Sequence, residues 1–365
     1  MNPFQWYLGV DLHKCVMTIA VLDASGATVQ IKTIPTKCVG RMRQLFQELP
    51  GPVAGAIEAV GMYRWLWKLA KPYCHKLVLA DAVELSYRRG RRRPKTDRND
   101  AEHLAKLLYH DDVPVAYVPE GPEFDLRRLG RQWHAASRML VGLKIRMRWF
   151  LNQANLRGPK NLDGASARRW LLAHGGALDD MAIDCVEDLL ATIEHLELQR
   201  VQRKRQIKRL CEKHFPALTE LLNTVPGIST VWAGILIGEI GDFGRFGSAE
   251  AFTCYTGLTR RVHESAGHVS PTGISHAGSR TLRWALYEAT TTLTRCDAQW
   301  KARYERLLKK MGCKKKARTA VARKLAGCLW GMAKTGECFR RGPSTHPTKA
   351  ANQARLARQT DKPAA

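Results

Sequence analysis

Apolar residues in the first third of the chain recur in runs of strand length, separated by turn residues. Residues 4–34 contain three such runs with the turn DASG between the second and the third, which predicts an antiparallel meander. Alternating helical and strand patterns follow, and this alternation favours parallel pairing. The predicted elements are a helix at 41–49, a strand at 52–60, a helix at 62–73 and a strand at 76–85. This order is typical of an α/β domain with a ribonuclease-H-like fold.

A helical pattern of alternating three- and four-residue spacing begins at residue 126, which predicts a heptad seam on a long helix. A second long helix is expected at about 186–215, where Arg200 and Arg203 interrupt the seam. Joined by a looser segment at 157–180, the two helices predict an antiparallel coiled-coil arm. The seam pairs within the chain or between two chains, so a dimer or tetramer is an expectation. The seam positions are Leu126, Leu129, Trp133, Ala136, Leu140, Leu143, Met147, Phe150 and Ala154, then Val186, Leu189, Ile193, Leu196, Ile207 and Leu210.

The last third reads as mainly helical. A Pro-Gly turn before Ser229 predicts a helix-hairpin-helix-like start, although such turns also serve plain packing. A capped helix at 248–258, a loop rich in glycine and serine, and helices to about residue 335 follow. The predicted domains are 1–118, 119–216 and 217–340, with a disordered basic tail at 341–365.

Charge narrows the choice of function. The 365 residues include 59 Lys and Arg against 33 Asp and Glu, for a net charge of +26. Such an excess favours a polyanionic partner, most simply nucleic acid, over a soluble protein that merely carries surplus lysine.

Localisation follows from two further patterns. The ten cysteines include no CxxC pair, and the N-terminal residues lack a signal-peptide pattern, so reduced thiols in a bacterial cytoplasm are expected. The most apolar helical run is interrupted by Glu239, so no membrane span is expected.

Acidic residues are scarce before residue 110, and four of them occupy informative positions. Asp11 ends the first strand, and Glu58 ends the buried strand, where a carboxylate facing water is the alternative reading. Asp97 and Asp100 lie three residues apart at the start of a helix, on a face that continues through Leu104 and Leu107. Helix capping explains one of this pair but not both.

Four carboxylates in one site would repel each other unless cations neutralise them. Oxygen ligands suit Mg²⁺ or Mn²⁺, and two such ions support phosphodiester chemistry. Basic residues beside this site and in the C-terminal loop are candidate nucleic-acid contacts. They are Arg88, Arg89, Arg91, Arg92, Arg93, Arg98, Arg260, Arg261 and Arg280.

The C-terminal loop also offers a nucleophile. A serine hydroxyl among basic residues could attack a phosphodiester and form a covalent ester with DNA. The residues alone do not choose among Ser265, Ser270, Ser275 and Ser279, and each could equally be a loop or capping serine.

Five segments occur in an order that resembles a known family. They are GVDLHK, AIEAVGMYRWLW, RRPKTDRNDAEHLAKLL, the segment from TVPGISTVW to SRTLRWAL, and ARKLAGCLWGMAKTGE. Together they resemble the DEDD-type transposases of the insertion sequence 110 family, which are related to the Piv DNA invertases.

The resemblance implies a RuvC-like N-terminal domain whose tetrad falls on Asp11, Glu58, Asp97 and Asp100. It further implies a coiled-coil arm and a C-terminal transposase domain in which Ser265 is the nucleophile. It also implies that a structured bridge RNA guides recombination of DNA, an expectation that nothing in the composition supports by itself. Relatives commonly carry SGGK where this chain has Ser265, Ala266, Gly267 and His268, and His268 would supply a weaker, pH-dependent charge.

Three other functions fit parts of the pattern. A Piv-type invertase would use the same residues on differently arranged DNA. A junction-resolving nuclease would use water in place of serine, and a nucleic-acid-binding scaffold would need neither the carboxylates nor the serine.

Overall fold

The chain forms two compact units, Met1–Val118 and Pro119–Ala365, in the computed structural model. The structure describes residues 3–88, 96–265, 268–275 and 278–341, and for residues 260–272 it describes the backbone alone. The predicted tail at 341–365 therefore lies outside the described residues, except for Arg341.

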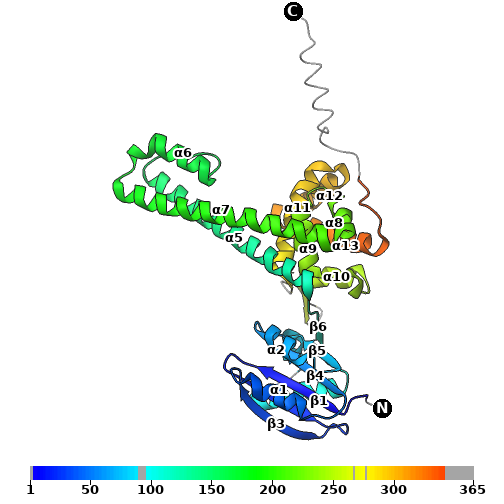
Figure 1. The fold of residues 1–365 in the computed structure, drawn as a ribbon. Coiled ribbons are helices and arrows are strands. Elements are labelled where there is room, and N and C mark those ends of the chain that lie inside the picture. Colours follow the sequence, from blue (N-terminus) through cyan, green and yellow to red (C-terminus); the bar gives the residue numbers. More distant parts are fainter. Residues whose placement is uncertain (1–2, 89–95, 266–267, 276–277, 342–365) are drawn as a thin grey trace, which may run out of the picture. The chain divides into compact units, whose positions relative to one another are not determined.

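The first unit is built on a mixed six-stranded sheet with the order β3-β2-β1-β4-β5-β6 (Figure 1). Strands β1, β2 and β3 are antiparallel, and β4 and β5 continue in parallel with β1, as the meander and the alternation predict. This order is compatible with a ribonuclease-H-like α/β domain. The elements are β1 (Trp6–Leu12), β2 (Val16–Leu22), β3 (Thr28–Pro35), α1 (Val39–Gln47), β4 (Val53–Glu58), α2 (Tyr63–Ala70), β5 (Lys76–Ala80), α3 (Ala82–Arg88), α4 (Asp97–Tyr109) and β6 (Val115–Ala116).

The strand predicted at 76–85 is too long. Strand β5 stops at Ala80, and α3 begins at Ala82. The Asp81 carboxylate accepts hydrogen bonds from the backbone N–H groups of Val83 and Glu84, so a local cap ends the strand and starts a helix. The short edge strand β6 was not predicted.

Two faces of the sheet have different chemistry. One buries the large side chains of Leu8, Val10 and Leu12, together with residues of α1 and α2. The other buries small side chains, such as Ala54 and Ala56, against α4. Because these side chains are small, α4 packs close to the strands.

The second unit is mainly helical. Its elements are α5 (Gly121–Gln153), α6 (Gly164–His174), η1 (Gly175–Ala177), α7 (Asp180–His214), α8 (Pro216–Asn223), α9 (Thr230–Ile240), η2 (Phe243–Arg245), α10 (Ala249–Tyr255), β7 (Arg260–Ser265), β8 (His268–Ile274), α11 (Arg280–Cys296), α12 (Ala298–Met311) and α13 (Lys314–Thr335).

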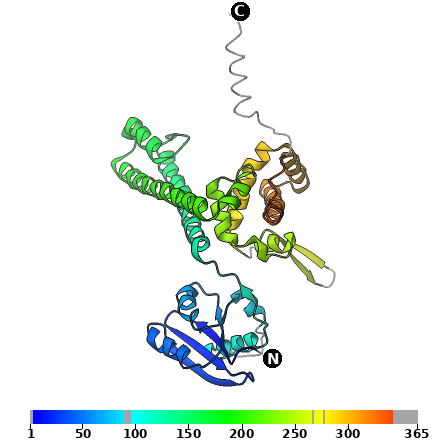
Figure 2. The same ribbon diagram turned by 45° about the vertical axis from the view of Figure 1, so that its right-hand side comes forward.

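Helices α5 and α7 lie side by side within one chain, and α6 packs on α7 at their distal end (Figures 1 and 2). The predicted loose segment thus contains a helix, which starts where the Asp163 carboxylate accepts the N–H of Ser166. The buried seam of α7 also differs from the predicted one, since Leu190 and Cys211 are buried while Leu189 and Leu210 are only partly covered.

The loop predicted after residue 259 contains a β-hairpin, visible in Figure 2. Strands β7 and β8 pair antiparallel, with Ser265 opposite His268. Valines and threonine in this segment favour strands over an irregular loop. Glycine and serine content alone was therefore a misleading signal.

No helix in the described part of the chain combines the length and apolar composition needed to cross a membrane. All ten cysteines are unbonded in the structure.

Candidate functional site

Two of the four predicted carboxylates end neighbouring strands of the sheet. Val10 pairs with Ile57 in the parallel register of β1 and β4, so Asp11 and Glu58 follow at the same level. Side chains alternate along a strand, and the residues two before each of them, Gly9 and Ala56, lie on the small-residue face that α4 covers. Asp11 and Glu58 thus belong to that face. Asp11 is 4% exposed, and Glu58 is half-buried.

Helix α4 carries the other two carboxylates in its first turn. Thr96 is the N-cap, because its side chain accepts the N–H of Asn99, so neither aspartate has that role. The buried stripe consists of Ala101, Leu104, Ala105 and Leu108. The predicted Leu104 is buried in this stripe, whereas the predicted Leu107 is only partly buried at its side.

Asp97 lies one turn before Ala101 and Asp100 one turn before Leu104, so both continue this stripe at the start of the helix, where the sheet covers it less completely. Asp97 has a half-exposed side chain, and Asp100 is partly buried. The packing of α4 on the sheet nevertheless brings Asp97 to Asp11.

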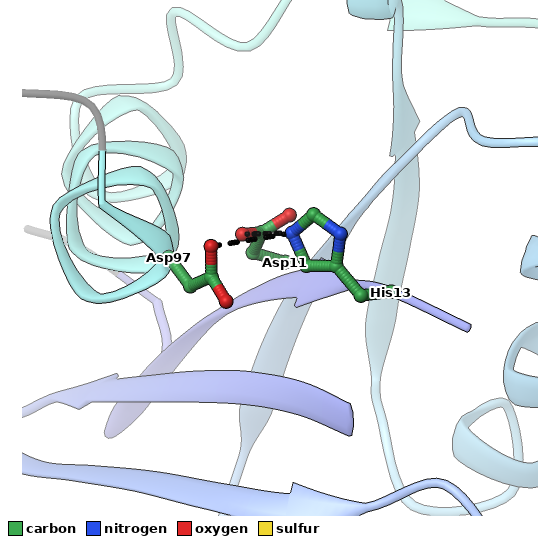
Figure 3. A group of neighbouring side chains, drawn as sticks. All are labelled: Asp11, His13 and Asp97. Carbon is green, nitrogen blue, oxygen red and sulfur yellow. Dashed lines mark hydrogen bonds and ion pairs between the residues drawn. The ribbon is translucent and has the colours of Figure 1, made fainter. Parts of the chain in front are cut away.

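His13 joins these two aspartates (Figure 3). Its Nε2 atom lies 3.1 Å from Oδ2 of Asp11 and 3.3 Å from Oδ1 of Asp97. In the described part of the chain, ligand atoms of Asp11, His13 and Asp97 lie within 4.8 Å of one another, a group that includes neither Glu58 nor Asp100. We call these three residues the Asp11 cluster.

The surroundings of Asp11 disfavour the ionised form of its carboxyl group. Burial raises the pKa of Asp11, and the charges of Asp97 and Asp100 raise it further, whereas His13 lowers it. Asp100 thus acts on Asp11 through its charge while lying outside the cluster. A bound cation would neutralise this excess of negative charge around Asp11 and so favour its ionised form.

His13 was not among the predicted site residues. It lies two residues after Asp11, just past the end of β1, and two-residue spacing places side chains on the same side of a strand. Alternation across GVDLHK was therefore a usable signal.

Gly9 sets the distance between α4 and β1. A Cβ atom at this position would collide with the carbonyl oxygen of Ala101 and the backbone nitrogen of Ala105. Only glycine permits this approach, and Asp97 lies one turn before Ala101 on the same helix.

The donor set fits a divalent cation. Two carboxylates and an imidazole converge from a strand end and a helix start. Burial and the charges of Asp97 and Asp100 disfavour ionisation of Asp11, and His13 offsets this only in part. Carboxylate oxygens are ligands that Mg²⁺ and Mn²⁺ prefer. Asp11 and Asp97 are the residues that would hold such an ion.

The structure describes the side chains of two of the four candidate serines, Ser275 and Ser279. Ser265 ends β7, and Ser270 lies on β8, within the range described by backbone alone. Ser279 is the N-cap of α11, where its hydroxyl accepts the N–H groups of Thr281 and Leu282. A capping role accounts for Ser279, and Ser275 has a buried hydroxyl with no hydrogen-bond partner among the described residues.

The predicted arginine contacts divide into three groups. Arg88 forms an ion pair with Asp112 at 2.7 Å and lies near Glu84, so it stabilises its own unit. Arg98 and Arg280 are exposed at helix starts. Arg89, Arg91, Arg92 and Arg93 lie outside the described residues, and Arg260 and Arg261 are described by their backbone alone.

Comparison with known proteins supplies the family. A profile of the DEDD transposases of IS110 type matches residues 8–156, and a profile described as the transposase IS116/IS110/IS902 family matches residues 219–305.

Similar proteins agree with these profiles. A Sinorhizobium fredii protein named "Putative transposase y4pF/y4sB" is 27% identical over 350 residues, covering 91% of this chain and 85% of the relative. The "Transposase for insertion sequence element IS1328" of Yersinia enterocolitica is 32% identical over 85 residues, which is 23% of this chain and 25% of that protein. The two profiles match in order along the chain, and the relatives with long matches carry the same description. The chain therefore belongs to the IS110 family of DEDD transposases.

Proposed function

We propose that this protein cuts and rejoins DNA strands as the transposase of an insertion sequence, with a divalent cation held by the acidic residues and Ser265 as nucleophile. One observation carries the proposal: Asp11 and Asp97, which come from separate elements, meet at His13 on the edge of the sheet. A buried carboxylate whose ionisation is opposed by its neighbours costs stability, and binding a metal is the function that offsets this cost.

The residues of the first unit would hold the cation. Asp11 and Asp97 bind it directly, His13 orients both carboxylates, and Glu58 and Asp100 add negative charge at the same edge. When bound, the ion stabilises negative charge on phosphate oxygens.

Ser265 would attack the phosphorus of one phosphodiester. The Ser265 hydroxyl loses its proton as the Oγ–P bond forms and the P–O bond to the leaving strand breaks, and the departing oxygen takes up one proton in exchange. A second strand end then displaces the serine and restores the phosphodiester, so the energy of the bond is conserved without a nucleotide cofactor.

Nucleic-acid binding follows from charge. The excess of basic residues suits DNA and, as in the family that the chain resembles, a structured bridge RNA that pairs with donor and target DNA. Arg98 and Arg280 are exposed candidates for backbone contacts. Such a protein acts at the nucleoid, as a dimer or tetramer.

Recombination of a donor plasmid tests the proposal. Wild type, Asp100→Ala, Ser265→Ala and the control Ser270→Ala are compared with and without RNA transcribed from the flanks of the gene. We expect Asp100→Ala and Ser265→Ala to lose activity and Ser270→Ala, on the neighbouring strand β8, to keep it. Equal activity without the RNA would exclude guidance by that RNA.

Two outcomes point to the other functions. Strand cleavage that survives Ser265→Ala would identify a nuclease that uses water. Inversion of a segment between inverted sites, without insertion elsewhere, would identify an invertase.

A further inference from the structure

A cavity of about 450 Å³ lies where α5, α7 and the start of α9 meet. Its lining includes Trp133 of α5, Arg200 and Lys204 of α7, and Ser229 and Trp232 at the start of α9. The volume lies within the roughly 300–1,000 Å³ of typical ligand sites. All of these lining residues belong to the helical unit.

The cavity occupies a gap in the packing of the two long helices. Apolar residues of α7 recur at the two seam positions of a heptad, as Val186, Leu190 and Ile193 before the gap and Ile207 and Cys211 after it. Continuing the same two series through the gap gives Glu197, Arg200 and Lys204. Polar residues therefore replace the expected core for about two turns of helix.

Charge in the gap is not balanced locally. Both carboxylate oxygens of Glu197 are engaged, one by Lys144 and the other by the N–H of Gly164, each at 3.0 Å. Neither Arg200 nor Lys204 forms an ion pair with another described residue, and the buried Nε of Arg200 has no hydrogen-bond partner among them. Burial lowers the pKa of Arg200, and the charge of Glu197, which also lines the cavity, offsets this only in part, so the position is costly for a cation without a ligand.

Flat side chains complete the site. The Arg200 guanidinium lies 4.9 Å from the ring centroid of Trp133, and Trp133 and Trp232 meet edge to face at 5.3 Å. Indole and guanidinium planes stack on unpaired bases, and the cations attract the phosphate of the same nucleotide. Ser229 makes no capping hydrogen bond at the start of α9, which leaves backbone donors of that turn beside the cations.

We propose that this cavity binds one unpaired nucleotide of a single-stranded nucleic acid, with the base against the tryptophan and guanidinium planes and the phosphate at Arg200 and Lys204. The inference rests on the proposed function as a nucleic-acid enzyme and adds a place where a strand is held outside the cutting site. Unpaired RNA and displaced DNA share this chemistry, so both are used as probes.

Binding of fluorescent oligo(U) and oligo(dT) to the full chain tests the site. We expect Arg200→Leu and Lys204→Ala each to weaken binding of at least one oligonucleotide about tenfold, with a salt slope shallower by about 0.7 for each lost phosphate contact. The control Arg205→Ala removes the same charge from an exposed position of α7 outside the cavity, and should change affinity less than about twofold. The oligonucleotide that loses more affinity identifies the strand that the cavity binds.

Arg200→Leu separates binding from folding. Leucine completes the apolar seam, so the melting temperature should stay equal or rise while binding is lost. Lys204 is exposed, so its replacement provides a second variant with an intact fold.

The proposal would be overturned if Arg200→Leu and Lys204→Ala bound both oligonucleotides as tightly as the control Arg205→Ala does. It would also be overturned if the two variants lost as much affinity for duplex DNA as for the single strands. Cleavage is not part of this measurement, so failure of the transposase mechanism is read separately, in the Ser265→Ala recombination assay.

Discussion

The ionised Asp11 side chain lowers the stability of the fold, although the proposed function requires it. Burial and the charges of Asp97 and Asp100 raise the pKa of this carboxyl group, so its ionised form opposes folding at neutral pH. A residue kept in spite of that cost is best explained by what it binds.

Asp11→Asn should therefore raise the melting temperature of the metal-free protein and abolish recombination. In the wild type, Mg²⁺ or Mn²⁺ should raise the melting temperature, and the variant should lose this shift. Thermal unfolding with and without the ion measures both effects. Asp125→Asn, which alters an exposed carboxylate outside the cluster, should keep the shift. A variant that melts lower and still responds to the ion would contradict the proposed site.

Gly9 offers an independent test of the same geometry. Gly9→Ala should destabilise the chain by about 1–3 kcal/mol, because its Cβ meets the backbone of α4 and pushes the helix away from β1. The metal-induced shift should weaken as well, although no ligand has changed. Gly61→Ala is the control, since a Cβ there meets no atom within 4 Å. Equal denaturation midpoints for the two variants would refute the role of Gly9.

Among the elements, α5 is fixed to the helical core by directed polar contacts. Arg131 donates to both carboxylate oxygens of Glu239, at 2.7 and 3.0 Å, and Arg127 donates to the carbonyl oxygens of Gly238 and Glu239. The Glu239 side chain is only 1% exposed, whereas that of Arg131 is 55% exposed. The glutamate that interrupts the apolar run of α9 is thus the partner of α5.

Arg131→Met should cost about 2–3 kcal/mol, less than the roughly 3–5 kcal/mol of a fully buried pair because water reaches the arginine. The loss comes mainly from leaving the Glu239 carboxylate buried without its partner. Arg131→Met combined with Glu239→Leu should recover most of it. Urea denaturation of the single and double variants measures the difference, and a double variant no better than the single one would contradict this cause.

His134, on the same helix, makes the contact between α5 and α11 sensitive to pH. Its Nδ1 lies 3.0 Å from Oγ1 of Thr281, and its ring stacks on Trp284 at 4.1 Å. Burial, helped by the charge of Arg138, lowers the pKa of His134 below its ordinary value of 6.5.

Below pH 6.5 the unfolded chain takes up a proton that the folded chain resists, so the free energy of unfolding falls. The stabilisation that comes from the neutral His134 is fully present above pH 6.5. It declines as the pH falls, until His134 of the folded chain is also protonated. His134→Gln should reduce this decline relative to wild type in urea denaturation across the range. His214→Gln, at an exposed histidine, should leave it unchanged.

At the scale of the whole molecule, the net charge of +26 predicts strongly salt-dependent binding. Raising the salt concentration from about 50 to 200 mM should lower affinity for DNA by on the order of a thousandfold if six or more phosphates are contacted. Titrations at several salt concentrations measure the slope. A flat slope would show that nucleic-acid binding does not depend on the basic surface.

The order of strands and the long helices could be predicted from the sequence because periodicity reports which face is buried. Local caps were harder to predict: Asp81 and Asp163 each start a helix within segments that read as strand or loop. The position of His13 depends on α4 meeting β1, a contact between distant segments that no local pattern contains. The sequence shows that Arg200 interrupts the heptad seam. The residues that line the cavity around it come from several helices, so only the structure identifies them.

The contacts of Arg127, Arg131 and His134 also have a mechanical consequence. They recur along one side of α5 at helical spacing, and they lock the rotation of that helix about its axis relative to α9 and α11. A rotation of α5 about its axis is therefore passed to the C-terminal end of α9 and to the start of α11, and is not absorbed by slippage at an apolar surface.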